Sequence, residues 1–315
     1  MNRCPITYLE CGDADYSPAG LRLLNSRLAG LSPLSLSAAE QRREALRLAG
    51  KLSIAGMQPK LSAVLNVAGA TFEPVERRGL YILKPQHADY PGLPENEGIT
   101  MQMARVAGLE VPVSGMVYSA DGSLTYFIRR FDRVGRTRKL ATEDFAQIAG
   151  LDRDSKYSFS MEKVVELVER HCTFPVIEKA RLFRRTVFCW LTGNEDMHTK
   201  NFSLITRCGK VELSPLYDCL NTTVVYLAIG RPLAEIDEIA LPLNGRKRKL
   251  LPRDLLDYFG KERLGLPGKV IAEAMGVFSG VMAEWLRLLE VSFLDDRLKE
   301  IYTEVLVRRK NTLGL

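Results

Sequence analysis

Length, composition and charge place this chain among ordinary folded proteins. It has 315 residues, of which 46% are hydrophobic and 26% charged, and this length suits one large two-lobed unit or two domains. The sequence contains no apolar run of about 18 residues and no apolar signal core after Met1, so we expect neither a membrane span nor export, and we predict a cytoplasmic protein.

The cysteines and the net charge narrow the function only slightly. Six cysteines are scattered without the paired spacing of a zinc site, and we expect reduced thiols. A net charge of +6 permits attraction to nucleic acid or to acidic ligands without requiring it. The basic run Arg246-Lys247-Arg248-Lys249 is typical of a solvated loop, with contact to a phosphate backbone or to a partner as the alternative.

The N-terminal part of the chain is predicted to be rich in strands. The first 50 residues mix loop and helix, and Ala38–Leu52 reads as one amphipathic helix. Two strands around a glycine loop come next, and a later helix has Pro94 at its start and Gly108 at its end. The pair Asp121-Gly122 predicts a hairpin turn. Further strands are predicted over residues 80–84, 114–119 and 124–130.

Helices dominate the chain beyond about residue 140. Ser160 is a good N-cap for a helix over 161–170, and a longer helix is predicted over 175–191. Gly193 follows it, where a C-terminal glycine belongs. The last third is predicted to be helical through Val307. A small β-rich part followed by a larger helical part predicts an α+β protein with a two-lobed, protein-kinase-like architecture.

The loop after the longer helix carries the candidate chemistry. Asp196 and Asn201 are five positions apart, which is the separation of the catalytic Asp and the metal-binding Asn in the protein-kinase catalytic loop. Phosphoryl transfer needs a carboxylate beside the attacking hydroxyl, and Asp196 is the candidate general base. Asn201 offers an oxygen to Mg²⁺, and Lys200 is placed to meet the transferred phosphate. The loop therefore predicts phosphoryl transfer from ATP.

A predicted hairpin returns a second candidate metal ligand to this loop. Residues 202–205 and 211–213 read as strands joined by a turn at 207–210, so we expect Asp218 to lie beside Asn201. Two oxygen ligands at one hairpin form a plausible clamp for Mg²⁺. The alternative is a polar loop in which the Asp and the Asn only cap turns.

Three further features are weaker when taken alone. His198 is counted with the catalytic residues, to orient the loop or to contact phosphate, because Asp196 already supplies a base. Lys84 ends an apolar strand, where a kinase keeps its phosphate-binding lysine, and Glu97 is either its ion-pair partner or a solvated glutamate. Residues 53–60 contain one glycine and no Walker A ending, so their composition indicates only a turn.

In combination these segments resemble the HipA family of bacterial serine/threonine kinase toxins. The matching stretches keep the order of the family over roughly residues 50–220, and the combination is far more specific than any single stretch. They are SIAGMQPKLSAVL (53–65), YILKP (81–85), NEGITMQMARVAGLEVP (96–112), RRFDR (129–133), EDFAQIAG (143–150), SKY (155–157), GNEDMHTKNFSLI (193–205) and LSPLYD (213–218). The resemblance implies a two-lobed, kinase-like fold, ATP and Mg²⁺ as cofactors, and phosphorylation of a protein.

The resemblance also implies roles for individual residues. Asp196 is the implied catalytic Asp, and Asn201 and Asp218 are the implied metal ligands. Ser53 aligns with the serine whose autophosphorylation ejects the phosphate loop and silences family members; by composition it is an ordinary loop serine, and Ser62 is an alternative in the next strand. The implied ATP-binding residues are Ala55, Gly56, Met57, Gln58, Pro59, Lys60, Lys84, Arg129, Arg130, Phe131, His198, Thr199, Lys200, Asn201, Tyr217 and Asp218.

Two departures from the family pattern affect what the resemblance implies. Full-length toxins have a glutamate where this chain has Arg129; backbone groups usually contact adenine, so this departure affects the implied role of the side chain and not the implied activity. Only about 50 residues precede the phosphate loop, so the chain is similar to HipT, a shortened kinase whose missing subdomain comes from a separate protein. The implied partners are a HipS-like small protein and a HipB-like antitoxin that alone contacts DNA, and the implied substrate is an aminoacyl-tRNA synthetase.

These expectations divide the chain into three parts. An extension over residues 1–50 packs on the small lobe, residues 51–135 form that lobe with Lys84, and residues 136–315 form the helical lobe with the catalytic loop. The leading interpretation is a serine/threonine protein kinase toxin of a toxin–antitoxin module. A small-molecule kinase of related fold, and a non-catalytic module that binds ATP and partners in a repressor–DNA complex, are the alternatives.

Overall fold

The computed structural model divides the chain into two compact units. It describes residues 2–49, 58–135, 137–152 and 154–315. Unit 1 comprises Met1–Gln102, Pro112–Arg138 and Glu290–Asp295, and unit 2 comprises Met103–Val111, Lys139–Leu289 and Asp296–Leu315. Each unit is thus assembled from separate stretches of the chain. The division into three parts at residues 50 and 135 stays a prediction.

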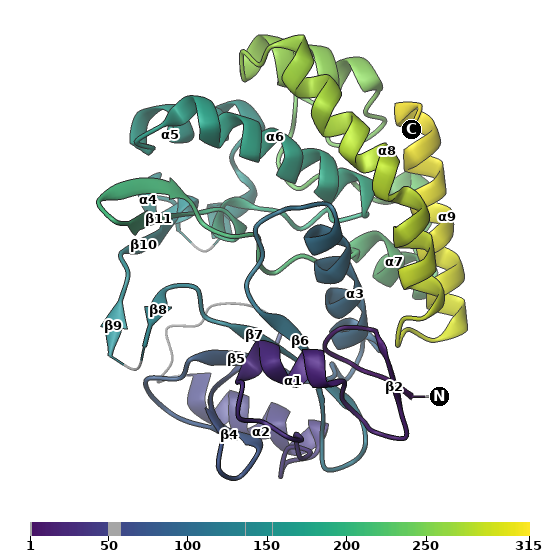
Figure 1. Cartoon of the computed structure of the whole chain (residues 1–315). Helices are drawn as coiled ribbons and strands as arrows, with labels where there is room; N and C mark the ends of the chain where they lie inside the picture. Colours follow the sequence, from purple (N-terminus) through teal and green to yellow (C-terminus); the bar gives the residue numbers. More distant parts are fainter. Residues whose placement is uncertain (1, 50–57, 136, 153) are drawn as a thin grey trace. The chain divides into compact units, whose positions relative to one another are not determined.

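A five-stranded antiparallel sheet forms the centre of unit 1 (Figure 1). Its strand order is β4-β3-β5-β7-β6, and the register places Lys84 opposite Tyr126. At the predicted hairpin turn, Gly122 has a φ of +78° and Ser123 N donates to Asp121 Oδ1 at 3.2 Å. The strands are β3 (Leu61–Asn66), β4 (Thr71–Pro74), β5 (Tyr81–Lys84), β6 (Ser114–Tyr118) and β7 (Leu124–Arg129), so the three predicted strands are confirmed.

The residues before position 49 pack on this sheet through one hydrophobic cluster. Ile6, Leu21 and Leu48 share that cluster with Leu83 and Phe127. The elements of this stretch are β1 (Asn2–Arg3), β2 (Glu10–Gly12), α1 (Pro18–Leu24) and α2 (Ala38–Ala49). The predicted helix over residues 38–52 is therefore described as far as residue 49, and its last three positions lie outside the described residues.

A buried polar bridge also ties α2 to the sheet. Gln41 Nε2 donates to Ser119 Oγ at 2.9 Å, and Thr125 Oγ1 donates to Gln41 Oε1 at 3.1 Å. The first helical amide, Ala38 N, donates to Asp121 Oδ2 at 2.9 Å. Because buried polar groups are costly without partners, these bonds fix the position of α2 on the sheet.

Residues from distant parts of the sequence complete unit 1. The helix α3 (Leu93–Val106) starts here and ends before Gly108, as predicted, and Gly108 has a φ of +68°. The ring of Tyr8 packs edge-on against the ring of Phe293, with centroids 5.5 Å apart. The short strands β8 (Arg133–Val134) and β9 (Arg138–Lys139) pair with each other.

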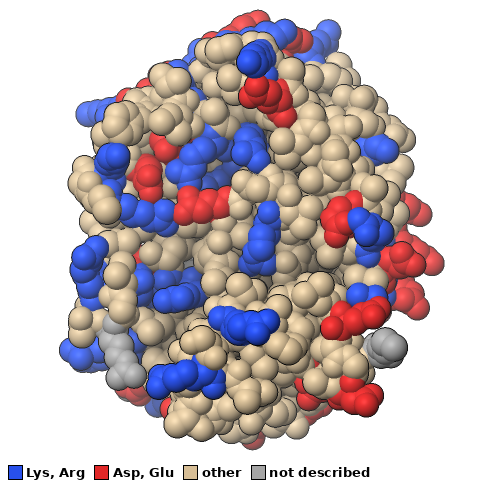
Figure 2. Space-filling view, in the orientation of Figure 1, with Lys and Arg blue, Asp and Glu red and all other residues tan. Residues whose placement is uncertain are grey.

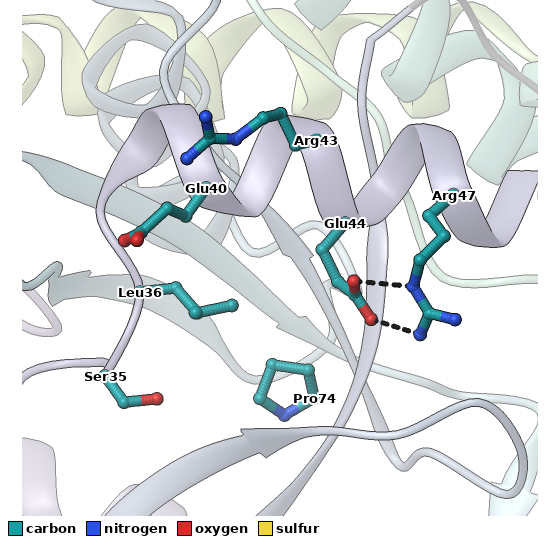
Figure 3. Close-up of a pocket in the computed structure, with 7 residues that line it drawn as sticks. All are labelled: Ser35, Leu36, Glu40, Arg43, Glu44, Arg47 and Pro74. Atoms are coloured by element: carbon teal, nitrogen blue, oxygen red, sulfur yellow. Dashed lines mark hydrogen bonds and ion pairs between the residues drawn. The ribbon is translucent and has the colours of Figure 1, made fainter.

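A hollow of about 500 Å³ lies beside α2 on unit 1 (Figure 3). Arg47 and Glu44 form an ion pair at its edge with an N···O distance of 2.7 Å. No described ATP-binding candidate lines this hollow, so it is not the nucleotide site expected from the sequence. Its lining residues are Ser35, Leu36, Glu40, Arg43, Glu44, Arg47 and Pro74.

Unit 2 is mainly helical (Figure 1). Ser160 Oγ accepts a hydrogen bond from Lys163 N, which confirms the predicted N-cap of α5. The longer helix, predicted over residues 175–191, buries five apolar side chains: Leu182, Phe183, Val187, Trp190 and Leu191. The helices are α4 (Phe145–Ile148), η1 (Asp154–Tyr157), α5 (Met161–His171), α6 (Pro175–Leu191), η2 (Thr199–Asn201), α7 (Thr222–Ala228), η3 (Leu233–Glu235), the π-helical η4 (Arg253–Arg263), α8 (Gly268–Glu290) and α9 (Asp296–Leu313).

Unit 2 also contains a three-stranded antiparallel sheet. The predicted hairpin is present as β11 (Ser203–Arg207) and β12 (Lys210–Leu213), and β10 (Thr142–Asp144) pairs with β11. The sequence does not predict β10, because three residues are too few for a strand alternation to show.

The C-terminal third differs from its prediction at two places. The helix α9 continues to Leu313, past the predicted end at Val307. Between η3 and η4 the chain is not helical, because Glu238 accepts hydrogen bonds from the backbone N–H groups of Lys249 and Leu250. A carboxylate that satisfies loop amides makes an irregular path stable there. Among the described residues, no helix is both long and apolar enough to span a membrane.

Candidate active site

Gly193 fixes the point at which α6 passes into the candidate catalytic loop. Its φ is +76°, and a Cβ at this position would lie 2.3 Å from Asn221 Oδ1. The Gly193 carbonyl accepts hydrogen bonds from Thr223 N and Thr223 Oγ1, both at 3.0 Å. Asn221 in turn caps α7 by accepting from Val224 N at 2.9 Å. Only glycine meets both requirements, so the loop starts from a position set by two helices.

Hydrogen bonds within the loop bring Asp196 and Asn201 together. Asp196 N donates to Asn194 Oδ1 at 2.9 Å, and the Asp196 carbonyl accepts from His198 N at 2.8 Å. The same carbonyl accepts from Asn201 Nδ2 at 2.8 Å. The Asp196 side chain is 43% exposed, whereas Asn201 is buried. The loop thus exposes the Asp196 carboxylate to solvent and holds the Asn201 amide in a fixed position.

The hairpin β11–β12 returns to this loop through Tyr217. Its phenol donates to the Lys200 carbonyl at 2.9 Å and lies 2.6 Å from Ser203 Oγ. Burial raises the pKa of Tyr217, so it stays a neutral donor. Asp218, the next residue, has a φ of +54° and its charge acts on the pKa of His198. A positive φ outside glycine is uncommon and recurs at functional sites.

His198 is held from the side of η1. The Lys156 ammonium donates to His198 Nε2 at 2.9 Å, and Thr199 Oγ1 donates to the Lys156 carbonyl at 2.9 Å. Burial lowers the pKa of His198 and the Lys156 charge adds to this, while Asp196 opposes it. Nδ1 of His198 is buried and has no hydrogen-bond partner among the described residues. A buried donor without a partner, next to the loop that carries Asp196 and Asn201, is suited to a ligand oxygen.

Tyr157 contacts the candidate base directly, and the sequence did not single it out. Its phenol donates to Asp196 Oδ1, and its ring meets the His198 ring edge-on, with centroids 5.1 Å apart. Burial raises the pKa of Tyr157, and the bond to Asp196 adds to that rise. The stretch Ser155-Lys156-Tyr157 matched the HipA pattern, which was the available signal, but the residue types alone carry none.

Glu195, directly before Asp196, is a second perturbed acid. Burial raises its pKa to about 7, and the Asp237 carboxylate contributes to the rise. Its backbone N–H donates to Thr222 Oγ1 at 2.8 Å. A carboxylic acid with such a pKa is partly protonated near neutral pH.

In unit 1, Lys84 and Glu97 form a buried ion pair. Lys84 Nζ lies 2.5 Å and 2.7 Å from the two carboxylate oxygens of Glu97, and the side chains are 3% and 1% exposed. The Tyr126 ring lies over the same ammonium, with its centroid 5.5 Å away. Of the two readings of Glu97, the ion-pair partner is therefore correct and the solvated glutamate is wrong.

The remaining candidates of unit 1 are only partly described. Ser53, Ala55, Gly56 and Met57 lie outside the described residues, and the half-buried Gln58, Pro59 and Lys60 lead into β3. In the RRFDR stretch, Arg130 forms two hydrogen bonds with Asp132, at 2.9 Å and 2.8 Å. Arg129 is exposed, and Phe131 is half-buried. Ser62 is buried in β3. The nucleotide-binding roles of these residues stay predictions.

A family comparison identifies the chain. The model of the HipA-like C-terminal domain matches residues 52–285. The chain belongs to the HipA-like C-terminal domain family. This confirms the resemblance to HipA, while the HipT type stays a prediction.

Sequence relatives of this HipA-like chain are named as kinases. A putative kinase of Haemophilus influenzae is 27% identical over 270 residues, covering 80% of this chain and 75% of that protein. The putative kinase Y4mE of Sinorhizobium fredii is 34% identical over 206 residues, covering 59% of this chain and 48% of that protein. The serine/threonine-protein kinase toxin HipA of Shewanella oneidensis is 29% identical over 191 residues, covering 54% of this chain and 43% of that protein. The chain thus spans about half the length of the latter two.

Two solved structures share the HipA-like fold. Shewanella oneidensis HipA, in a complex with HipB and operator DNA, superposes with a TM-score of 0.68 at 22% identity, covering 91% of this chain and 74% of that chain. The Helicobacter pylori proinflammatory kinase CtkA gives a TM-score of 0.56 at 17% identity, covering 83% of this chain and 91% of that chain. The predicted α+β, kinase-like fold with a small β-rich unit and a larger helical unit is therefore confirmed.

The donor set of the HipA-like loop fits Mg²⁺. Asn201 uses its Nδ2 for the Asp196 carbonyl, which leaves Oδ1 as its oxygen without a partner among the described residues. The described residues contain no group of three or more His, Cys, Asp or Glu side chains that could form a metal site. Mg²⁺ keeps several waters and phosphate oxygens and takes only one or two protein oxygens, so an amide and a carboxylate suffice.

Proposed function

We propose that this chain is an ATP-dependent serine/threonine protein kinase. The carrying observation is the five-residue spacing of Asp196 and Asn201, with the Asn201 side chain held by the bond from its Nδ2 to the Asp196 carbonyl. Protein kinases require a carboxylate for the acceptor hydroxyl and an amide for the metal at this separation. A loop with only turn-capping roles has no need for an exposed carboxylate beside a buried orphan His198 Nδ1.

In this proposal Asp196 accepts the proton of a serine or threonine hydroxyl while the hydroxyl oxygen bonds to the γ-phosphorus and the bond to ADP breaks. Asn201 and Asp218 hold Mg²⁺, which neutralises phosphate charge when bound. Lys84, kept in place by Glu97, contacts the ATP phosphates. Lys200 and His198 contact the transferred phosphate.

The finer assignment follows the HipA resemblance. We propose a cytoplasmic toxin that phosphorylates an aminoacyl-tRNA synthetase and phosphorylates itself at Ser53. A HipB-like DNA-binding antitoxin and a HipS-like small protein are the proposed partners, and the solved complex of the Shewanella HipA with HipB and operator DNA supports the first. A chain phosphorylated at Ser53 is then expected to bind ATP weakly. Equal ATP affinities of the phosphorylated and unphosphorylated chains would contradict regulation by Ser53.

The test is phosphate incorporation in the presence of Mg²⁺ and ATP. The intact mass of the wild type is expected to increase by added phosphate, and its phosphopeptides are expected to include Ser53. The rate of phosphate incorporation by Asp196→Asn is expected to be lower by a factor of about 10² to 10⁴. Asp257→Asn is the matched control, because Asp257 forms an exposed ion pair with Lys261 in the same unit. Incubation with a lysate distinguishes the two kinds of kinase. A protein kinase is expected to label a protein in the lysate, whereas a small-molecule kinase is expected to label only a small molecule. Equal rates for wild type and Asp196→Asn overturn the proposal.

The non-catalytic alternative finds little support in the basic run. Arg246 lies 3.8 Å from Asp254, and Lys247 and Arg248 lie 4.0 Å and 3.4 Å from Asp237. On the face drawn in Figure 2, most Lys and Arg side chains lie in the centre and on the left, and most Asp and Glu side chains lie on the right. Ion pairs of this kind reduce the net positive field that non-specific DNA binding needs.

A further inference from the structure

The short helix η1 contacts the candidate catalytic loop through consecutive side chains. Lys156 bonds to His198 through its ammonium and to Thr199 through its carbonyl. Tyr157 bonds to Asp196 Oδ1 through its phenol. These contacts lie about 40 positions apart in sequence and are all within unit 2. The helix therefore forms one wall of the loop.

The ring of Tyr157 is held on several sides. Lys156 Nζ lies 4.8 Å and Lys247 Nζ 5.8 Å from the ring centroid, and the His198 ring meets it at an interplanar angle of 81°. Cations over an aromatic face are attracted to it, and edge-to-face rings are a favoured pair. Although Tyr157 is 39% exposed, these neighbours restrict the rotation of its ring and so support the position of its phenol.

The phenol engages only one oxygen of the carboxylate. Tyr157 bonds to Oδ1, and His198 Nε2 lies 4.0 Å from the same oxygen. Oδ2 of Asp196 has no partner among the described residues. With 43% of the side chain exposed, the carboxylate without Tyr157 is free to rotate and to bind water through either oxygen. The bond therefore selects which oxygen faces an incoming hydroxyl.

We propose that Tyr157 is a positioning residue for phosphoryl transfer, which donates to Asp196 Oδ1 and so directs Oδ2 at the acceptor hydroxyl. Lys156 supports the same arrangement by holding His198. The inference rests on the proposed kinase function. It assigns Tyr157 an effect on the chemical step and none on ATP binding, because none of its described contacts involves a proposed phosphate- or metal-binding side chain other than His198.

The test compares Tyr157→Phe with Tyr258→Phe. Both variants keep the ring and lose a phenol that donates to a carboxylate, because Tyr258 donates to Glu162 Oε1 at 3.1 Å, outside the loop. Phosphate incorporation is measured against ATP concentration at a temperature below the unfolding midpoints of both variants. We expect the maximal rate of Tyr157→Phe to fall about tenfold or more, with the half-saturating ATP concentration changed less than about twofold. Tyr258→Phe is expected to match wild type.

A double variant separates positioning through Asp196 from a general structural role. In the Asp196→Asn background, Tyr157→Phe is expected to leave the residual rate unchanged, since residues that act as a unit are not additive. A further tenfold fall in that background, or a Tyr157→Phe rate equal to wild type, overturns the positioning role while leaving the kinase proposal intact. A rate above wild type also overturns it, since Tyr157 would then obstruct the base. Wild-type protein without Asp196-dependent transfer overturns the kinase function, and the positioning role with it.

Discussion

Lys84 and Glu97 are bonded to each other through both carboxylate oxygens in the interior of unit 1. The two residues are 13 positions apart, on β5 and on α3. Because both charges are withdrawn from water, each helps to compensate the charge of the other. The pair therefore links the strand to the helix and also fixes the ammonium proposed to contact ATP.

Removing one partner of this pair is expected to destabilise unit 1. Lys84→Met removes the countercharge that Lys84 supplies to the buried Glu97 carboxylate, and removing one partner of a buried pair costs about 3–5 kcal/mol. The double variant Lys84→Met/Glu97→Gln removes both charges and is expected to recover most of that loss. Urea unfolding measures the midpoints, and a double variant less stable than Lys84→Met would contradict a compensating pair.

Gly193→Ala is expected to cost more stability than Gly209→Ala. Both glycines have nearly the same φ, +76° and +75°, so both variants carry a left-handed backbone cost of about 1–2 kcal/mol. At Gly209 a Cβ meets nothing within 4 Å, whereas at Gly193 it lies 2.3 Å from Asn221 Oδ1. The clash adds about 1–3 kcal/mol at Gly193. Thermal unfolding of the two variants compares them, and equal midpoints would mean that Asn221 moves aside freely.

Glu195 is expected to make stability fall as pH rises from about 4.5 to about 7. Its pKa in the folded chain is raised to about 7 by burial, from an ordinary value near 4.5. The folded state therefore favours the protonated acid, so its stabilising effect is complete below about pH 4.5 and is lost as pH rises through the window. Relative to Glu195→Gln, the wild type should lose stability across that window and not above it. A difference that does not change with pH would refute the raised pKa.

Asp218 is expected to govern the Mg²⁺ requirement of phosphate incorporation. Asp218→Asn keeps the shape of the side chain and removes its charge, so the Mg²⁺ concentration for half-maximal rate should rise at least about tenfold. Asp218→Ala is expected to abolish transfer while the chain stays folded. Unchanged activity in Asp218→Ala would remove Asp218 from the metal site. The exposed Asp257→Asn serves again as control.

Local signals predicted the parts of this fold that depend on local chemistry. The Asp121-Gly122 turn, the Ser160 cap and the Gly193 helix stop need only their neighbours in sequence, and each is present. The hairpin β11–β12 was predicted for the same reason. Such features follow from turn and cap preferences that tertiary context rarely overrides.

The contacts that shape the candidate site could not be predicted in this way. Tyr157 meets Asp196 across 39 positions, and Lys156 meets His198 across 42. A tyrosine and a lysine in a short 3₁₀ helix show no periodicity that points at a partner so far along the chain. Likewise, Glu238 stabilises an irregular path that helical propensity alone would not indicate.

The packing of Tyr8 on Phe293 has a consequence for how the protein is made. Tyr8 leaves the ribosome 285 positions ahead of Phe293, and both belong to unit 1. Domains generally fold as units during synthesis, from the N-terminus onward. Here the sheet can form early, but the last stretch of its unit arrives only after nearly all of unit 2. A translating ribosome therefore carries an unfinished unit 1 until residues 290–295 have been synthesised.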